Sequence, residues 1–242
     1  MINMIDYQCN RKKYKNNSLY THLNKIYSDY KILVWNFWYI LINKNTNRNV
    51  IKIYFTDNFY KKEYNNYFLL KNTGILLPKI LKIDKINYLW SYYKIIHFEN
   101  IRKFKKSFKS FNKVNLKDLS FLLWKIHAIY FNNWKWLVHW NLHYSNLFIN
   151  SEYKLWLFDL VSMNVNYLES DFADILYYSN YDLKLLKTII KQYEYKDILE
   201  FKKIYYFTIL KIQQNIMYSW SMVNKKLLKQ KLKKFISLYK KI

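Results

Sequence analysis

The first hundred residues carry apolar runs of the kind that form β-strands. Two of these runs, 32–41 and 50–55, are rich in β-branched and aromatic residues and are separated by the turn-forming cluster 43–48. Residues 61–72 instead repeat their aromatic positions at helical spacing. Residues 1–30 are polar and predict a helix with loops. We therefore expect one main helix among four strands in this part of the chain, the strands spanning 32–41, 50–55, 79–83 and 89–96.

Helical periodicity dominates the second half of the chain. Asn115, a residue type favoured at helix N-caps, precedes apolar positions that recur at helical spacing up to residue 130. Three further helices are predicted near the C-terminus, at 183–193, 198–218 and 225–241. The last of these is basic, and we interpret it as an amphipathic helix with a solvated lysine face.

A short β-pattern interrupts the helical half. The apolar runs 147–149 and 154–158 flank the turn-forming residues 150–153, which predicts a β-hairpin. The residue entering the first strand of a hairpin lies beside the residue leaving the second, so Asn146 and Asp159 should converge. Mg²⁺ binds carboxylate and carbonyl oxygens and keeps waters and phosphate oxygens for its other positions. We therefore predict both residues as metal ligands.

Two further polar features lie beside apolar segments. His139, Asn141 and His143 alternate along a loop or extended segment and are expected to face one point. Lys52 falls inside the run 50–55, where strand alternation places it on the face opposite Ile51 and Ile53. A charged residue within a β-branched run indicates either a functional lysine or an edge-strand lysine that faces water.

Composition excludes some classes of protein. Of the 242 residues, 52% are hydrophobic and 21% aromatic, which excludes a disordered chain. The net charge of +25 favours nucleic acid as a partner. However, the chain has one Gly and one Pro and an excess of Lys, Asn, Ile and Tyr, as drift in an AT-rich genome produces, and the basic residues are spread along the chain. We therefore do not expect a nucleic-acid partner.

The same survey bears on location. The single cysteine, Cys9, rules out an internal disulfide and fits a reducing compartment. The N-terminal residues lack the apolar core of a signal peptide, and the longest apolar run is too short to span a bilayer. We expect a cytoplasmic monomer with no membrane partner.

The polar motifs together resemble those of a known superfamily. His139-Trp140-Asn141-Leu142-His143-Tyr144-Ser145-Asn146, Phe158-Asp159 and Asp171-Phe172-Ala173 resemble the His-x-Asp-x-His-x-x-Asn, Ile-Asp and Asp-x-Ala elements of the aminoglycoside phosphotransferase, choline kinase and thiamine kinase superfamily. The sequence departs from this pattern at two positions. Asn141 stands where the family has its catalytic aspartate, and Val161 stands where a glutamate is usual.

The resemblance implies a protein-kinase-like, two-lobed α+β fold. A small β-rich nucleotide-binding lobe would span 1–97, and a mainly helical catalytic and substrate-binding lobe would span 98–242. Glu63, Gly74 and Pro78 follow the family's spacing of glutamate, glycine and proline, and Gly74 is expected in a left-handed conformation at the C′ position of the helix. The family's phosphate-covering glycine turn has no counterpart between residues 28 and 57, where Asn36 takes the place of its last residue.

The resemblance also implies roles for the site residues. ATP and magnesium are the expected cofactors, with Asn146 and Asp159 as metal ligands. Lys52, oriented by Glu63, would pair with the phosphates. Asn141 and His139 occupy the catalytic positions. Structural support is assigned to His127, His143 and Asp171.

The acceptor implied is the hydroxyl of a small cationic alcohol, most closely thiamine, with choline or ethanolamine as the alternative. Aromatic residues such as Trp220 or Tyr178 would hold such a cation. Two other classes stay open. One is a degenerate, inactive binding protein, because of Asn141 and Val161, and the other is a basic nucleic-acid-binding protein.

Overall fold

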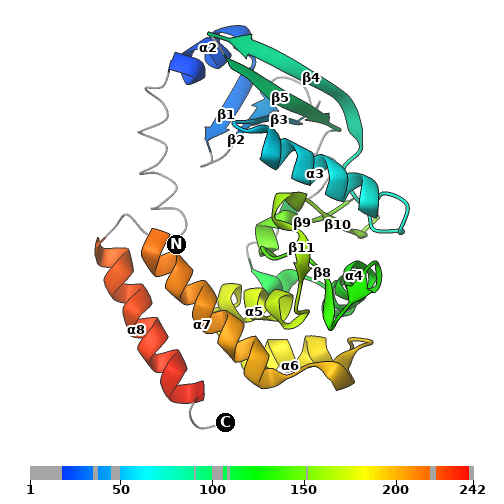
Figure 1. Ribbon diagram of the computed structural model, residues 1–242, viewed down its shortest axis with the longest axis vertical. Helices are drawn as coiled ribbons and strands as arrows, with labels where there is room; N and C mark the ends of the chain where they lie inside the picture. The colour runs from blue at the N-terminus through cyan, green and yellow to red at the C-terminus, as the bar shows by residue number, and fades with distance from the viewer. Residues whose placement is uncertain are drawn as a thin grey trace.

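The computed structural model describes the chain in eight stretches, which form two lobes (Figure 1). The N-terminal lobe is built on an antiparallel sheet, and the C-terminal lobe is mainly helical, so the predicted α+β two-lobed fold is confirmed. None of the helices in the described stretches is long and apolar enough to cross a membrane. The described residues are 18–34, 38–44, 50–89, 91–99, 106–107, 110–150, 152–218 and 222–239.

The N-terminal sheet has five strands in the order β1-β2-β3-β5-β4, and every neighbouring pair is antiparallel. The prediction of one strand over 32–41 is wrong, because this run forms the hairpin β1–β2, with Val34 paired to Tyr39. In sequence, the single polar residue of this run, Asn36, is compatible with one long strand as well as with a change of direction. The strands are β1 (Tyr30–Val34), β2 (Trp38–Asn43), β3 (Val50–Tyr54), β4 (Ile80–Tyr88) and β5 (Ser91–Phe98).

Helices α2 (Ser18–Ile26) and α3 (Asp57–Leu70) complete this lobe. Helix α3 begins four residues earlier than predicted, with Asp57 as the acidic residue of its first turn. Glu63 lies in the second turn and is buried against the sheet. At this position the Glu63 carboxylate contacts Lys52 and Tyr54 of β3.

Gly74 has the left-handed conformation that was predicted, with φ of 73°. Its predicted C′ position is wrong, because α3 ends at Leu70 and its C-cap is Lys71, in a right-handed conformation. A Cβ at Gly74 would lie 2.9 Å from Nζ of Lys125, which donates a hydrogen bond to the Gly74 carbonyl. The glycine is therefore required by the turn after α3 and by its contact with the C-terminal lobe.

The C-terminal lobe begins with α4 (Leu116–Ala128), which the Asn115 side chain caps as predicted by accepting from the Lys117 N–H. The predicted hairpin is confirmed: β9 (Leu147–Ile149) pairs with β10 (Leu155–Leu157), and Leu147 faces Leu157. Strand β6 (Lys106–Ser107) pairs with β9, and β7 (Phe131–Asn132), β8 (Lys135–Val138) and β11 (Asn164–Asn166) form a separate sheet in the order β11-β8-β7. The remaining helices are α5 (Glu169–Tyr178), α6 (Leu183–Lys191), α7 (Phe201–Tyr218) and α8 (Met222–Tyr239).

Alternate residues of β3 pack on opposite faces of the N-terminal sheet. Ile51 and Ile53 enter the core between the sheet and α2. Val50 and Tyr54, on the other face, join a second cluster that also contains Phe158 of the C-terminal lobe. This interlobe cluster brings this face of the sheet against the hairpin exit, and Lys52 lies on the same face. Its buried members are Trp38, Val50, Tyr54, Ile96, Phe98, Phe158 and Val161.

Candidate active site

Lys52 is the centre of the candidate site. Its ammonium nitrogen lies 2.5 Å from Glu63 Oε2 and 2.8 Å from Asp159 Oδ1, and its side chain is fully buried. The Trp38 ring covers the ammonium at 4.1 Å from the ring centroid. The alternative of an edge-strand lysine facing water is excluded, because β3 lies between β2 and β5.

Burial and charge act in opposite directions on these groups. Burial alone lowers the pKa of Lys52, but the Asp159 and Glu63 carboxylates outweigh burial and raise it above its ordinary value. Burial raises the pKa of Glu63, and Lys52 opposes that effect only in part. Tyr54 donates a hydrogen bond to Glu63 Oε2 at 2.6 Å, which anchors the carboxylate on α3. The site thus holds one cation between two carboxylates.

Asp159 lies where the hairpin exits, in a left-handed conformation with φ of 61°. A non-glycine residue in this region stores backbone strain, as is common at functional sites. Phe158 donates its backbone N–H to the Asn146 carbonyl at 2.9 Å, which extends the hairpin ladder by one pair and brings Asn146 beside the exit. Lys52 contacts only Oδ1 of the Asp159 carboxylate, whose side chain is 18% exposed.

Asn146 and Asp159 are the residues that would hold a magnesium ion. Asn146 Nδ2 donates to the Asn141 carbonyl at 3.1 Å, which leaves the Asn146 amide oxygen as an acceptor beside the hairpin exit. Over the described residues no group of three or more His, Cys, Asp or Glu side chains gathers as a metal cluster. One carboxylate and one amide oxygen suit an ion that keeps water and phosphate oxygens as its other ligands.

Asp171 fixes the segment that precedes the hairpin. Its carboxylate accepts the backbone N–H groups of His139 and Trp140, each at 2.8 Å. His127 Nε2 lies 3.1 Å from the same carboxylate, and His127 Nδ1 lies 2.6 Å from the Tyr193 hydroxyl. Burial raises the pKa of Asp171, but the histidines and these hydrogen bonds outweigh burial and hold it below its ordinary value. Helices α4 and α5 thereby hold the loop through one buried anion.

The three alternating residues do not all face one point, contrary to expectation: Asn141 and His143 both contact Tyr178, and His139 does not. The His139 side chain is fully buried, with Nε2 3.4 Å from the Phe158 carbonyl oxygen, so it faces the hairpin exit. The His143 ring packs against Tyr178 at 4.3 Å between centroids. The partly exposed Asn141 accepts a hydrogen bond from the Tyr178 hydroxyl at 3.2 Å. Asn141 and His143 are partly exposed, whereas His139 is fully buried.

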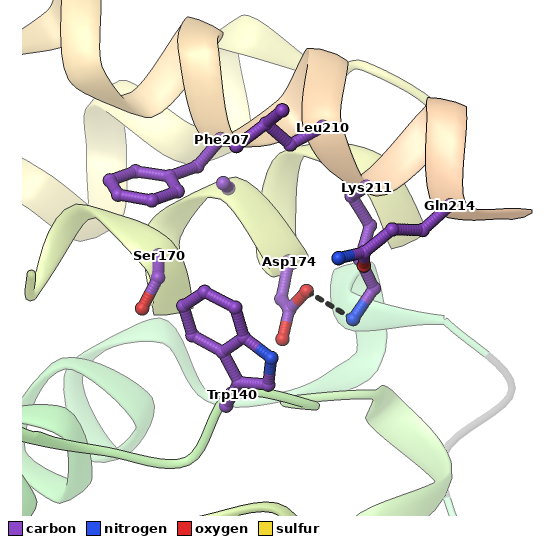
Figure 2. Close-up of a pocket in the computed structure, with 8 residues that line it drawn as sticks. Trp140, Ser170, Asp174, Phe207, Leu210, Lys211 and Gln214 are labelled. Carbon is purple, nitrogen blue, oxygen red and sulfur yellow. Dashed lines mark ion pairs between the residues drawn. The ribbon is translucent and has the colours of Figure 1, made fainter. Parts of the chain in front are cut away.

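A pocket beside this loop was not predicted from the sequence (Figure 2). Asp174 and Lys211 form an ion pair of 2.7 Å on one side of it, and Trp140 lies on the other. Asp174 Oδ2 also accepts the Leu142 N–H at 2.8 Å. A carboxylate one turn after Asp171 in an apolar helix was the available signal. Asn36 and Trp220, singled out in the sequence, lie outside the described residues.

The arrangement is that of a protein-kinase-like fold. It combines two lobes, the group of Lys52, Glu63 and Asp159 between them, and the loop that Asp171 holds. No protein-family model matches the sequence, and no curated protein is significantly similar to it. Solved structures do match. Their sequence identity to this chain is low, so the match shows a shared fold. Choline kinase LicA from Streptococcus pneumoniae is 14% identical, with 91% of this chain and 98% of that chain covered and a TM-score of 0.61.

Two other solved structures give the same result. The microcompartment-associated aminopropanol kinase is 9% identical, with 93% of this chain and 97% of that chain covered and a TM-score of 0.65. ADP-bound aminoglycoside phosphotransferase APH(2'')-Ib is 14% identical, with 91% of this chain and 96% of that chain covered and a TM-score of 0.58. The chain spans nearly the full length of all three proteins.

Proposed function

We propose that the protein transfers the γ-phosphoryl group of ATP to the hydroxyl of a small alcohol, as a member of the aminoglycoside phosphotransferase and choline kinase superfamily. The observation that carries this proposal is the buried Lys52 held between Glu63 and Asp159 at the interlobe face. No packing requirement explains a lysine on a central strand. A cation fixed by two carboxylates suits the binding of a polyphosphate with a divalent metal.

The residues have distinct roles in this proposal. Lys52, oriented by Glu63, contacts the phosphates. Asp159 and Asn146 hold magnesium, which neutralises charge on the phosphates when bound. The bond from the γ-phosphorus to its bridging oxygen breaks, and a bond from the acceptor oxygen to that phosphorus forms. The hydroxyl proton leaves to water, and ADP is released. The first 97 residues bind the nucleotide, and residues 98–242 provide the acceptor site.

Asn141 makes this a slow enzyme rather than an inactive one. An amide does not take a proton at neutral pH, and a positioned base contributes about 10²–10⁴-fold to a rate. Phosphoryl transfer depends chiefly on positioning and on electrostatic stabilisation by the metal and cations. The hairpin, Lys52 and Asp159 supply these, and Asn141 remains able to hold the acceptor oxygen.

We propose thiamine as the first acceptor to test and choline or ethanolamine as the second. The names of two similar structures, a choline kinase and an aminopropanol kinase, support a small amino or ammonium alcohol. The aromatic rings of Tyr178 and Trp140 near Asn141 favour an acceptor with an apolar or cationic body.

The direct test is a phosphate-transfer assay with magnesium-ATP and thiamine, choline, ethanolamine or an aminoglycoside. We expect slow transfer to at least one acceptor, a loss of more than about 100-fold in Asp159→Ala and a gain of about 10²-fold or more in Asn141→Asp. Asp197→Ala, a change of the same type in the 3₁₀ turn Lys196–Ile198, is the matched control. If Asn141→Asp and the wild type both fail with every acceptor, a non-catalytic binding protein is the better interpretation.

A further inference from the structure

A chain of polar side chains connects α7 to Asn141. Asp174 and Lys211 are paired at 2.7 Å. The Lys211 ammonium lies beside Tyr178, 5.4 Å from its ring centroid, and its positive charge acts on the Tyr178 hydroxyl. Tyr178 in turn donates to Asn141 Oδ1 at 3.2 Å. Asp174 is buried and the Lys211 side chain is only 15% exposed, so this ion pair is largely shielded from water.

The charge of the ammonium favours one direction for the hydrogen bond between Tyr178 and Asn141. A lysine ammonium has protons to donate and no lone pair to accept one. The positive charge therefore favours a lone pair of the Tyr178 oxygen toward Lys211, and the single hydroxyl proton points to Asn141. The Asn141 atom that faces Tyr178 must then be the amide oxygen and not the amide nitrogen. This settles the orientation of an amide whose two ends have nearly the same shape.

The other end of the amide is the group available to a ligand. Over the described residues, Asn141 Nδ2 donates no hydrogen bond. The backbone of Asn141 is also fixed, because its carbonyl accepts from Asn146 Nδ2 at 3.1 Å and from the His143 N–H at 2.8 Å. The residue therefore has a fixed backbone, an occupied oxygen and a free N–H₂ group.

We infer that Tyr178, held by Lys211, is a positioning residue that fixes Asn141 with its amide N–H₂ toward the acceptor oxygen. The inference rests on the proposed phosphoryl transfer. Asn141 then donates to a lone pair of the acceptor oxygen and does not receive its proton. Residue 141 therefore takes no part in removing the acceptor's proton, which passes to water.

A double-mutant cycle tests this positioning. With Asn at 141, Tyr178→Phe lets the amide flip, and we expect kcat to fall about tenfold with an unchanged KM for ATP. With Asp at 141 the two oxygens are equivalent and no flip exists. Tyr178→Phe in the Asn141→Asp background should therefore change kcat less than about twofold. Equal losses in the two backgrounds would show a merely structural role for Tyr178 and overturn the inference.

A matched control and a second readout separate this inference from the proposed function. Tyr181→Phe removes a hydroxyl from a ring that packs on Phe235 outside the polar chain and should leave kcat unchanged. Protein labelled with ¹⁵N at asparagine reports the Asn141 amide, assigned by its loss in Asn141→Asp. Tyr178→Phe should shift that resonance, and Tyr181→Phe should not. An unmoved resonance overturns the inference whether or not phosphate is transferred, and a moved resonance supports it even in a protein without kinase activity.

Discussion

Lys52 is the residue whose removal should disturb the molecule most. Lys52→Met leaves Glu63 and Asp159 facing each other without a cation, and breaking a buried pair in this way costs about 3–5 kcal/mol. We expect the free energy of unfolding in urea to fall by that amount. Adding Glu63→Gln removes one of the two carboxylates and should recover part of the loss. A Lys52→Met variant as stable as the wild type would show that Lys52 is not paired with Glu63 and Asp159 in solution.

His143 gives the molecule a predictable response to acid. Burial, and then the charge of Lys211, lower its pKa to about 4. Its Nδ1 accepts the Ser145 N–H, so the neutral ring carries its proton on Nε2. Between the unfolded pKa of about 6.5 and the folded pKa, only the unfolded chain takes up this proton, so stability is complete above that interval and is lost as the pH falls through it.

The His143→Asn variant tests this response. It keeps an acceptor for the Ser145 N–H and does not titrate. The loss of unfolding free energy between pH 7 and pH 4 should therefore be smaller in the variant, by at most about 3 kcal/mol. Urea denaturation at a series of pH values measures the difference. Parallel curves for the two proteins would show that His143 is not the group responsible.

At the scale of single elements, the turn after α3 offers a stability test. Gly74→Ala places a Cβ on a backbone with φ of 73° and 2.9 Å from the Lys125 ammonium. Backbone strain of this kind costs about 1–2 kcal/mol, and the lysine must also move. We expect a loss of that size in urea denaturation. Asn72→Ala, in the same turn but without positive φ, is the matched control and should be nearly neutral.

The elements were predictable where the sequence marks their ends. Asn115 caps α4 as predicted, and the turn at 150–153 was sufficient to predict β9 and β10. The hairpin β1–β2 was missed because an apolar run with one polar residue, Asn36, fits one long strand or two paired strands equally well. The start of α3 was missed because residues 57–60 have no strong apolar spacing, and their helical state depends on packing against the sheet.

At the scale of the whole molecule, the site divides into a predictable part and a hidden part. Lys52 was recognisable as a charge in a β-branched run, and Asn146 and Asp159 by their places at the hairpin ends. Tyr178 and Lys211 were not recognisable as partners of Asn141, because only the packing of α5 on α7 brings them together. Lysines and tyrosines are also so frequent in this chain that neither stands out by type.

The interlobe cluster should determine whether the lobes unfold together. Phe158, from the hairpin exit, packs edge-on against Phe98 of β5 at 5.4 Å between centroids and is nearly buried. Few described polar contacts join the lobes beside it, among them the Lys52–Asp159 pair and the hydrogen bond from Asn66 Nδ2 to the Leu160 carbonyl. Phe158→Ala should therefore cost about 3–5 kcal/mol and weaken the coupling between the lobes.

Hydrogen exchange resolves the two lobes separately. In the wild type, amides of β3 and α5 should report the same free energy of opening, as expected for one cooperative unit. In Phe158→Ala, β3 should open at a lower free energy than α5, because the N-terminal sheet loses the apolar contact that ties it to the larger core. Phe121→Ala, the same truncation at a side chain that is 53% exposed, should leave both unchanged. Equal losses in β3 and α5 of the Phe158 variant would mean that the lobes stay coupled through the ion pair and the backbone contacts alone.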